Sequence, residues 1–213
     1  MANPTNVAGM ARFGINPKNT LGVSVRDLRK IAKEVGHDHD AAQRLWHSGI
    51  HEARIVASLV DVAKLVTETQ MEAWVKGFDS WDVCDLCCLN LFRKTRFAYR
   101  KAIEWSAREE EFVKRAGFVV MATLAVHDKK ENDSVFQEFL PIIEKGASDE
   151  RNFVKKAVNW ALRQIGKRNT VLNKLAIETA EGLQTTNSKS TRWIALDALR
   201  ELKSEKIQST LKG

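Results

Sequence analysis

The sequence predicts an all-α protein, and three observations support that fold class. Apolar residues recur every three or four positions along most of the 213-residue chain, which is the spacing of helices with one buried face. Only 3 prolines and 11 glycines are present, which is few for the many turns of a β-sandwich or β-barrel. Alternating strand patterns joined by Asn-Gly or Asp-Gly turns are absent from the sequence.

The helices can be placed in order from their capping residues and apolar faces. Ser24 and Asp27 resemble a capping box, and the helix that they begin is expected to end at Gly36. A central helix is expected to begin at Trp81, after the stop signal at Gly77. The other expected helices cover residues 40–47, 51–65, 68–76, 93–107, 109–126, 134–145, 149–165, 170–181 and 190–202, with a short helix in the tail.

A helical motif recurs in the second half of the chain. The segment Glu111–Val119 is matched by Asn152–Trp160, 41 residues later, and Thr191–Leu196 is a weaker copy. A period of about 40–47 residues is typical of HEAT-like and armadillo repeats. We therefore expect a right-handed α-α superhelix, which is a solenoid of antiparallel helical pairs whose inner helices line a concave basic face.

The stretch Phe78–Cys88 contains the carboxylate that is hardest to explain by helix formation alone. Ser80 is placed to cap free backbone N–H groups, and Asp82 lies in the first turn, where the helix dipole favours an acid. Asp85 lies a full turn further on, among apolar residues, and shares a helix face with Trp81. Because a charge in apolar surroundings is costly without a cation, Asp85 is either the partner of a structural Arg or a functional carboxylate.

The chain is basic, with 34 Lys and Arg residues, 27 Asp and Glu residues and a net charge of +7. This balance favours a polyanionic partner. Two segments concentrate cations without a single acid, namely Arg93, Lys94, Arg96, Arg100 and Lys101 in the first, and Arg151, Lys155, Lys156, Arg163, Lys167 and Arg168 in the second.

One helical stripe of the second segment combines an aromatic residue with cations: Lys156, Trp160, Arg163 and Lys167. Trp160 on such a stripe is either exposed for a ligand or placed at the seam between two repeats. A solenoid with cationic inner helices suits the phosphate backbone of nucleic acid, with an affinity that depends on salt.

Other candidate sites are weaker. Cys84, Cys87 and Cys88 have no second Cys or His pair at the spacing of a zinc site, so we interpret them as small packing residues rather than metal ligands. His47 and His51 lie four residues apart but without an HExxH motif, and we interpret them as structural or exposed. We expect neither a metal nor a cofactor.

Three motifs in this order resemble the DNA alkylation repair family of HEAT-like-repeat DNA glycosylases (AlkD-like). They are Ser80–Asp85, Phe112–Ala116 and Phe153–Arg163, and Leu21–Arg29 is similar to the family's entry into its second repeat. The resemblance covers roughly residues 21–202. We expect residues 1–20 to form a partly irregular N-terminal extension and residues 21–213 to form a single domain.

The resemblance implies a function and a site. The implied reaction is hydrolysis of the N-glycosidic bond of positively charged N3- or N7-alkylated purines in double-stranded DNA, as in base excision repair. The implied catalytic residues are a carboxylate and the aromatic residues that flank the lesion: Asp85, Trp81 and Trp160. The expected DNA-binding cations are Arg115, which the resemblance assigns to a backbone phosphate, and Lys156, Arg163 and Lys167.

The alternative function is a non-catalytic HEAT-like module that binds nucleic acid or an acidic protein. Asp85 separates the two hypotheses, because a phosphate-binding surface gains nothing from an anion on it. No run approaches the 18 apolar residues of a membrane-spanning helix, and the N-terminus lacks the pattern of a signal peptide. We expect a cytoplasmic monomer without a membrane partner, associated with the nucleoid when bound to DNA.

Overall fold

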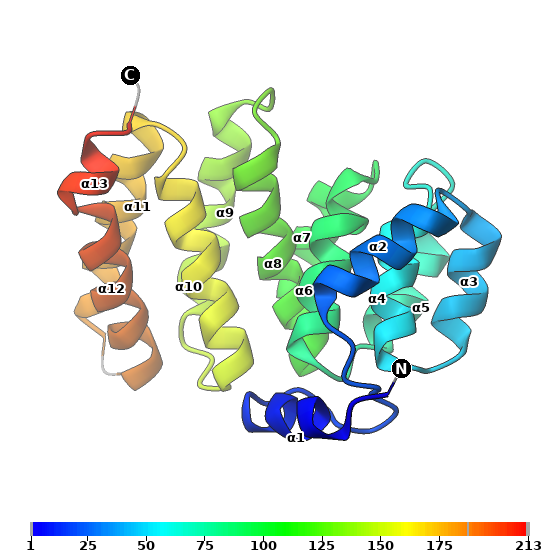
Figure 1. The fold of residues 1–213 in the computed structure, drawn as a ribbon. Helices are drawn as coiled ribbons and strands as arrows, with labels where there is room; N and C mark the ends of the chain where they lie inside the picture. Colours follow the sequence, from blue (N-terminus) through cyan, green and yellow to red (C-terminus); the bar gives the residue numbers. More distant parts are fainter. Residues whose placement is uncertain (1, 187, 212–213) are drawn as a thin grey trace. The chain divides into compact units, whose positions relative to one another are not determined.

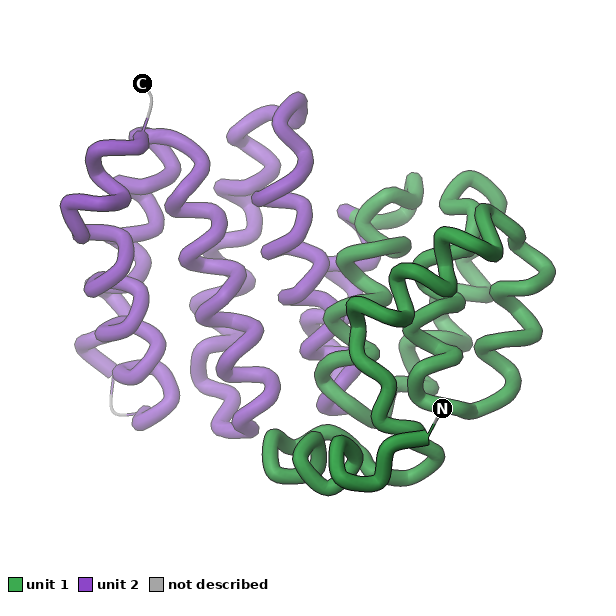
Figure 2. Tube along the Cα trace, viewed as in Figure 1, with its two compact units in different colours: residues 1–98 green, residues 99–213 purple. Residues whose placement is uncertain are grey.

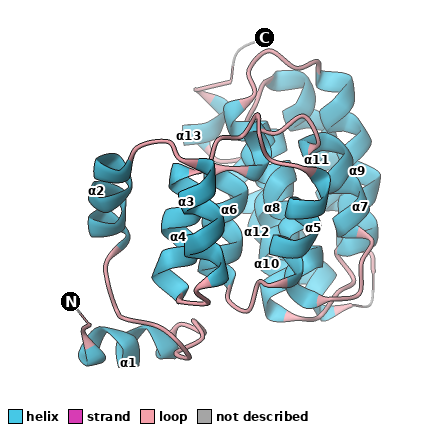
Figure 3. Cartoon of the chain, turned by 90° about the vertical axis from the view of Figure 1, so that its right-hand side faces the viewer, coloured by secondary structure: helices cyan, strands magenta, loops and turns pink. Residues whose placement is uncertain are grey.

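The computed structural model describes residues 2–186 and 188–211, and all regular elements in these residues are helices (Figure 3). The prediction of an all-α protein is confirmed. The chain divides into two compact units, residues 1–98 and 99–213 (Figure 2). The division falls at the start of a helix, within the range of residues 21–213 that was expected to form one domain. Residues 212 and 213 of that range lie outside the described residues.

Unit 1 is built from short helices whose aromatic residues form its core. Trp46 and Trp74 stack with ring centroids 4.2 Å apart, and Phe78 and Phe92 pack at their edges. In chain order its elements are α1 (Pro4–Arg12), α2 (Val25–Val35), α3 (His39–His47), α4 (His51–Val60), α5 (Glu68–Lys76), α6 (Trp81–Asn90) and the 3-10 turn η1 (Phe92–Lys94) (Figure 1).

Unit 2 contains longer helices. After α7 (Ala98–Ser106), which begins at the division, they are α8 (Glu111–His127), α9 (Asp133–Gly146), α10 (Asn152–Gly166), α11 (Thr170–Gln184), α12 (Lys189–Leu202) and α13 (Glu205–Gln208). In Figure 1, α8, α10 and α12 lie side by side, and α10 packs on both of the others. No helix in the described residues is long and apolar enough to cross a membrane.

The predicted repeat is confirmed in unit 2, because its copies are the neighbouring helices α8, α10 and α12. Phe112 and Phe153 occupy equivalent positions of α8 and α10, and their rings lie 5.5 Å apart. Gly117 lets α8 approach α7, since a Cβ at this position would overlap the backbone of Ala102 and Ser106. The repeated motif therefore marks one layer of packed helices.

The cap of α2 follows the prediction. Ser24 Oγ accepts a hydrogen bond from the backbone N–H of Asp27 at 3.2 Å, and Gly36 ends the helix with φ of +76°. That positive φ is readily adopted by glycine, which explains the stop signal.

Two expected helices differ from the structure. The helix predicted over residues 51–65 ends at Val60. The residue that follows, Asp61, ends it because its carboxylate accepts a hydrogen bond from the backbone N–H of Val62 at 2.7 Å. The helix predicted over residues 93–107 begins only at Ala98, since Thr95 is extended and its hydroxyl donates to the Phe92 carbonyl. The N-terminal extension contains the regular helix α1, with Pro4 at its start.

Candidate functional site

The start of α6 is organised by a buried carboxylate. Asp82 accepts a hydrogen bond from Ser80 Oγ at 2.6 Å, and its other oxygen lies 2.8 Å from Nε2 of His51 at the start of α4. The expectation that Ser80 caps the helix with its side chain is wrong: its hydroxyl donates to Asp82, and its oxygen accepts from the backbone N–H of Asn16 rather than from a helix N–H. The expectation that Asp82 is chiefly a first-turn residue is also incomplete, since the carboxylate joins α6 to α4.

This pair has altered proton affinities. Burial opposes the charged form of His51, but the hydrogen bond and the charge of Asp82 outweigh burial and raise the His51 pKa. For Asp82, burial alone would raise the pKa, and the bonds from His51, Ser80 and the Val83 backbone outweigh it, so that the pKa is lowered. The geometry favours a charged pair that joins two helices.

The three side chains do not form a nucleophilic triad. In such a triad the histidine stands between the serine and the acid, whereas here Asp82 stands between Ser80 and His51. Ser80 and His51 are also buried. We therefore assign this cluster a structural role. The interpretation of His51 as structural is confirmed, and its acidic partner 31 residues away could not be read from local spacing.

Trp81 and Asp85 lie one helical turn apart on the less buried face of α6, as the sequence predicts. The other face of the helix is buried and includes Val83, Cys84 and Cys88. Trp81 Nε1 donates a hydrogen bond to the carbonyl oxygen of Phe13 at 3.0 Å, which fixes the indole against the segment that follows α1.

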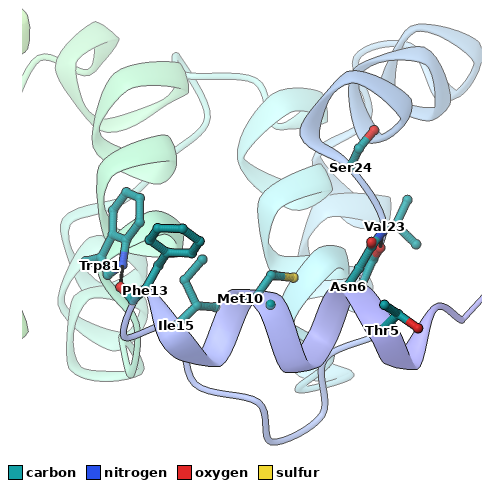
Figure 4. Close-up of a pocket in the computed structure, with 10 residues that line it drawn as sticks. Thr5, Asn6, Met10, Phe13, Ile15, Val23, Ser24 and Trp81 are labelled. Atoms are coloured by element: carbon teal, nitrogen blue, oxygen red, sulfur yellow. Dashed lines mark hydrogen bonds between the residues drawn. The ribbon is translucent and has the colours of Figure 1, made fainter.

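A pocket of about 520 Å³ opens beside Trp81 (Figure 4). Its walls are largely apolar and come from α1, from the segment between α1 and α2, and from Trp81. The lining residues are Thr5, Asn6, Gly9, Met10, Phe13, Ile15, Gly22, Val23, Ser24 and Trp81. Phe13 is 74% exposed and contributes an aromatic ring to this wall. The sequence prediction missed this wall, because residues 1–20 carry no recognisable binding motif.

The wall is held in place by Glu52, which is buried in α4. Its carboxylate accepts hydrogen bonds from the backbone N–H groups of Leu21, Gly22 and Val23 at 2.6–3.2 Å. α1 is tied to the same loop, because Asn6 Nδ2 donates to the Gly22 carbonyl at 2.9 Å. Gly22 has φ of +79°, and a Cβ there would overlap the N-terminal backbone.

The predicted site residues of unit 2 lie on α8 and α10. Arg115 is only 5% exposed, and its guanidinium donates a hydrogen bond to the carbonyl oxygen of Phe153 in the next repeat. Lys156, the equivalent residue of α10, is exposed. Trp160 is half-buried, and the Gln164 amide oxygen accepts from its Nε1 at 3.1 Å in the orientation that satisfies both groups.

Two cations of the predicted stripe are paired within the protein. Lys167 Nζ lies 2.7 Å from a carboxylate oxygen of Glu201 on α12. Arg163 donates to the other oxygen of Glu201 and lies 3.6 Å from Asp197. Burial would raise the Glu201 pKa, but Lys167 and Arg163 lower it. These pairs join α10 to α12, so the stripe is less available to an anion than the sequence indicates.

The cysteines are packing residues, as predicted. Cys84, Cys87 and Cys88 have no exposed surface, and burial raises the pKa of the Cys87 thiol. Among the residues that the structure describes, no group of three or more His, Cys, Asp or Glu side chains is arranged to hold a metal ion.

The fold and the repeats define the class of this protein as an all-helical HEAT-like repeat protein. A solved structure with TM-score 0.76 is similar in fold; it represents a new family of proteins related to the HEAT-like repeat DNA glycosylases, with affinity for branched DNA structures. The two chains are 18% identical, with 94% of this chain and 90% of the other covered. A designed armadillo repeat protein is 16% identical at TM-score 0.39 over 83% of this chain and 92% of its own.

The chain belongs to the DNA alkylation repair enzyme family, whose model matches residues 1–202. The resemblance seen in the sequence is thereby confirmed, and the match includes the N-terminal segment that contains α1. No curated protein matches the chain.

Proposed function

We propose that this protein removes positively charged N3- or N7-alkylated purines from double-stranded DNA by hydrolysis of the N-glycosidic bond. The observation that carries the proposal is the pair Trp81 and Asp85, one turn apart on the less buried face of α6, where Trp81 also lines an open pocket. Membership of a DNA alkylation repair family supports it.

The chemistry requires few groups. An alkylated purine of this kind is cationic, so when the bond from C1′ to the base nitrogen breaks, the bonding electrons neutralise the base as it leaves. Positive charge develops on the deoxyribose, and a carboxylate fixed beside it stabilises that charge. Water then bonds to C1′ and loses a proton. In this scheme Asp85 stabilises the sugar and orients the water, and no general acid is needed for the base.

The aromatic residues would act on the same positive charge. Trp81 can contribute cation–π stabilisation of about 0.5–2 kcal/mol to the cationic base or the developing sugar cation. Phe13, exposed beside Trp81 in the pocket of Figure 4, offers a second aromatic face in unit 1. In unit 2 we assign Trp160 the role of the further aromatic contact with the lesion.

The cations of unit 2 have different roles in this proposal. Lys156 is exposed and can meet a phosphate directly. Arg115 is only 5% exposed and donates to the Phe153 carbonyl oxygen, which limits its contact with a phosphate. Arg163 and Lys167 would have to exchange Glu201 for a phosphate, which lowers their net contribution to binding.

The test is release of 7-methylguanine or 3-methyladenine from alkylated duplex DNA by the purified protein, followed by chromatography of the free bases. We expect release by the wild type and a roughly 10²–10³-fold slower single-turnover rate for Asp85→Asn, which removes one preorganised charge. A wild-type protein that binds the duplex but releases neither base would refute the proposal.

The second candidate is a non-catalytic protein that binds branched DNA, which is favoured by the described affinity of the similar structure. Binding of an undamaged four-way junction and of a linear duplex of equal length separates the candidates. A binder should prefer the junction and release no base, and its affinity should be unchanged or higher in Asp85→Asn.

A further inference from the structure

Three cations of unit 1 surround a small hollow between the segment after α4 and the 3-10 turn η1 that follows α6. The hollow has a volume of about 370 Å³ and is lined by Lys64 and its neighbours after α4, and by Lys94 and Arg96 around the end of η1. Lys64, Lys94 and Arg96 are all exposed. The cations therefore come from two separate loops and meet at one place.

In the structure, the cations of the first acid-free segment, residues 93–101, fall into two groups. Arg100 and Lys101, at its end, are paired with Glu104 at 2.8 and 2.6 Å. Lys94 and Arg96 have no ion pair within the described residues, and the same is true of Lys64. Two cations of the segment that have no such pair, Lys94 and Arg96, therefore line the hollow.

Electrostatics at the hollow favour an anion from outside the chain. Burial lowers the pKa of Lys94, and the neighbouring charge of Arg93 lowers it further. Burial also lowers the pKa of Arg93, whose Nε donates to the Leu89 carbonyl and not to an acid. Partly desolvated like charges repel one another, and an anion placed among them removes that cost.

We propose that the hollow formed by Lys64, Lys94 and Arg96 binds the phosphate backbone of DNA, as a contact separate from the pair Trp81 and Asp85. α6 has 10 residues, from Trp81 to Asn90, so its two ends are about 15 Å apart. Lys94 and Arg96 follow α6 in the chain, so a strand that passes Trp81 at the start of α6 is long enough to extend to the hollow.

A nucleic acid strand fits this site better than a small phosphorylated molecule. The polar side chain within the lining is already used, because Thr95 Oγ1 donates to the Phe92 carbonyl at 2.8 Å. What remains are exposed cationic side chains at the rim, with the Arg96 guanidinium resting 4.8 Å from the centre of the Phe97 ring. Such a rim attracts a backbone by charge and does not enclose a single anion.

The test is the salt dependence of binding to an undamaged duplex, which is independent of base excision. The hollow variant carries three changes, Lys64→Gln, Lys94→Gln and Arg96→Gln. The control variant removes the same charge from exposed positions of unit 2, through Lys145→Gln, Lys174→Gln and Lys206→Gln. If two phosphate contacts are lost, the slope of log K against log salt should fall by about 1.8, since each contributes about 0.9. This corresponds to about 60-fold weaker binding at 0.1 M salt when the curves converge at 1 M.

We expect the control variant to keep nearly the wild-type slope and both variants to keep the wild-type melting temperature. Equal slopes for the two variants would overturn the proposal, because net charge alone would then explain the affinity. Inorganic pyrophosphate serves as a probe for small anions. Micromolar stabilisation by pyrophosphate that the hollow variant loses, with an unchanged DNA slope, would also overturn it.

Discussion

The two aspartates of α6 stand three residues apart and have different surroundings. Asp82 is buried between Ser80 and His51, and its charge is matched inside the protein. Asp85 lies on the less buried face together with Trp81. At the scale of single residues, we therefore assign the stability of the fold to Asp82 and the proposed chemistry to Asp85.

The first prediction compares the two carboxylates. Asp82→Asn removes the counter-charge of a buried histidine and should cost roughly 3 kcal/mol of unfolding free energy. Asp85→Asn should leave the midpoint of denaturant unfolding close to that of the wild type. Urea denaturation of both variants measures the difference. If Asp85→Asn were the more destabilising change, Asp85 would be the structural carboxylate.

The second prediction concerns pH. The raised pKa of His51 means that the pair contributes its full stability below the ordinary histidine value of 6.5 and loses it as pH rises through the folded-state pKa. The lowered pKa of Asp82 adds stability above 3.8 that is lost as pH falls further. The melting temperature of the wild type should therefore fall from pH 6 to pH 8 by more than that of His51→Gln/Asp82→Asn. Parallel curves would contradict a charged pair.

At the scale of elements, α1 depends on contacts that lie far away in the sequence. Glu52 binds three consecutive backbone N–H groups of the loop after α1, and Asn3 N–H donates to the Leu21 carbonyl at 2.7 Å. A helix of nine residues is marginal by itself. The position of Phe13 beside Trp81 is thus determined by a carboxylate of α4.

The third prediction follows from this anchor. Glu52→Gln places an amide where three N–H donors converge and should cost about 2–3 kcal/mol, because charged hydrogen bonds are lost. Cleavage by trypsin at Arg12 should become faster as α1 detaches, and release of alkylated bases should slow. Glu34→Gln, an exposed change on α2, is the control. Unchanged cleavage would show that other contacts hold α1.

At the scale of the whole molecule, the positive charge is unevenly available to a partner. Of the second cationic segment, Arg151 is paired with Asp149, which lowers the Asp149 pKa to about 2. Arg163 and Lys167 are paired with Glu201. The number of cations in this segment therefore overstates the cationic surface that unit 2 offers to an anion. Unneutralised cations, such as Lys156 and those of the unit 1 hollow, are expected to dominate DNA affinity.

The fourth prediction uses this internal pairing. Glu201→Gln releases Arg163 and Lys167 and should tighten binding to an undamaged duplex by about tenfold at 0.1 M salt, equivalent to one additional phosphate contact. Glu205→Gln, on the exposed side of α13, changes the net charge equally and is the control. Fluorescence anisotropy with a labelled duplex measures both. Equal effects of the two changes would show that pairing does not limit Arg163 and Lys167.

The sequence by itself determined the helical class, the repeat, the family and the shared face of Trp81 and Asp85. These features follow from local rules, because helix periodicity and capping act over a few residues and the repeat is a direct comparison within the chain. Some helix boundaries could not be predicted from periodicity and capping. α4 ends early because of Asp61, whose carboxylate also binds His39 and Gln70.

Only the tertiary structure decided which charges are neutralised and what surrounds the site. His51 pairs with Asp82 across 31 residues, and Arg163 with Glu201 across 38. Local periodicity contains no information on such partners, because they depend on how helices pack. The same is true of Phe13 beside Trp81 and of the hollow formed by Lys64, Lys94 and Arg96, where residues from separate segments meet only after folding.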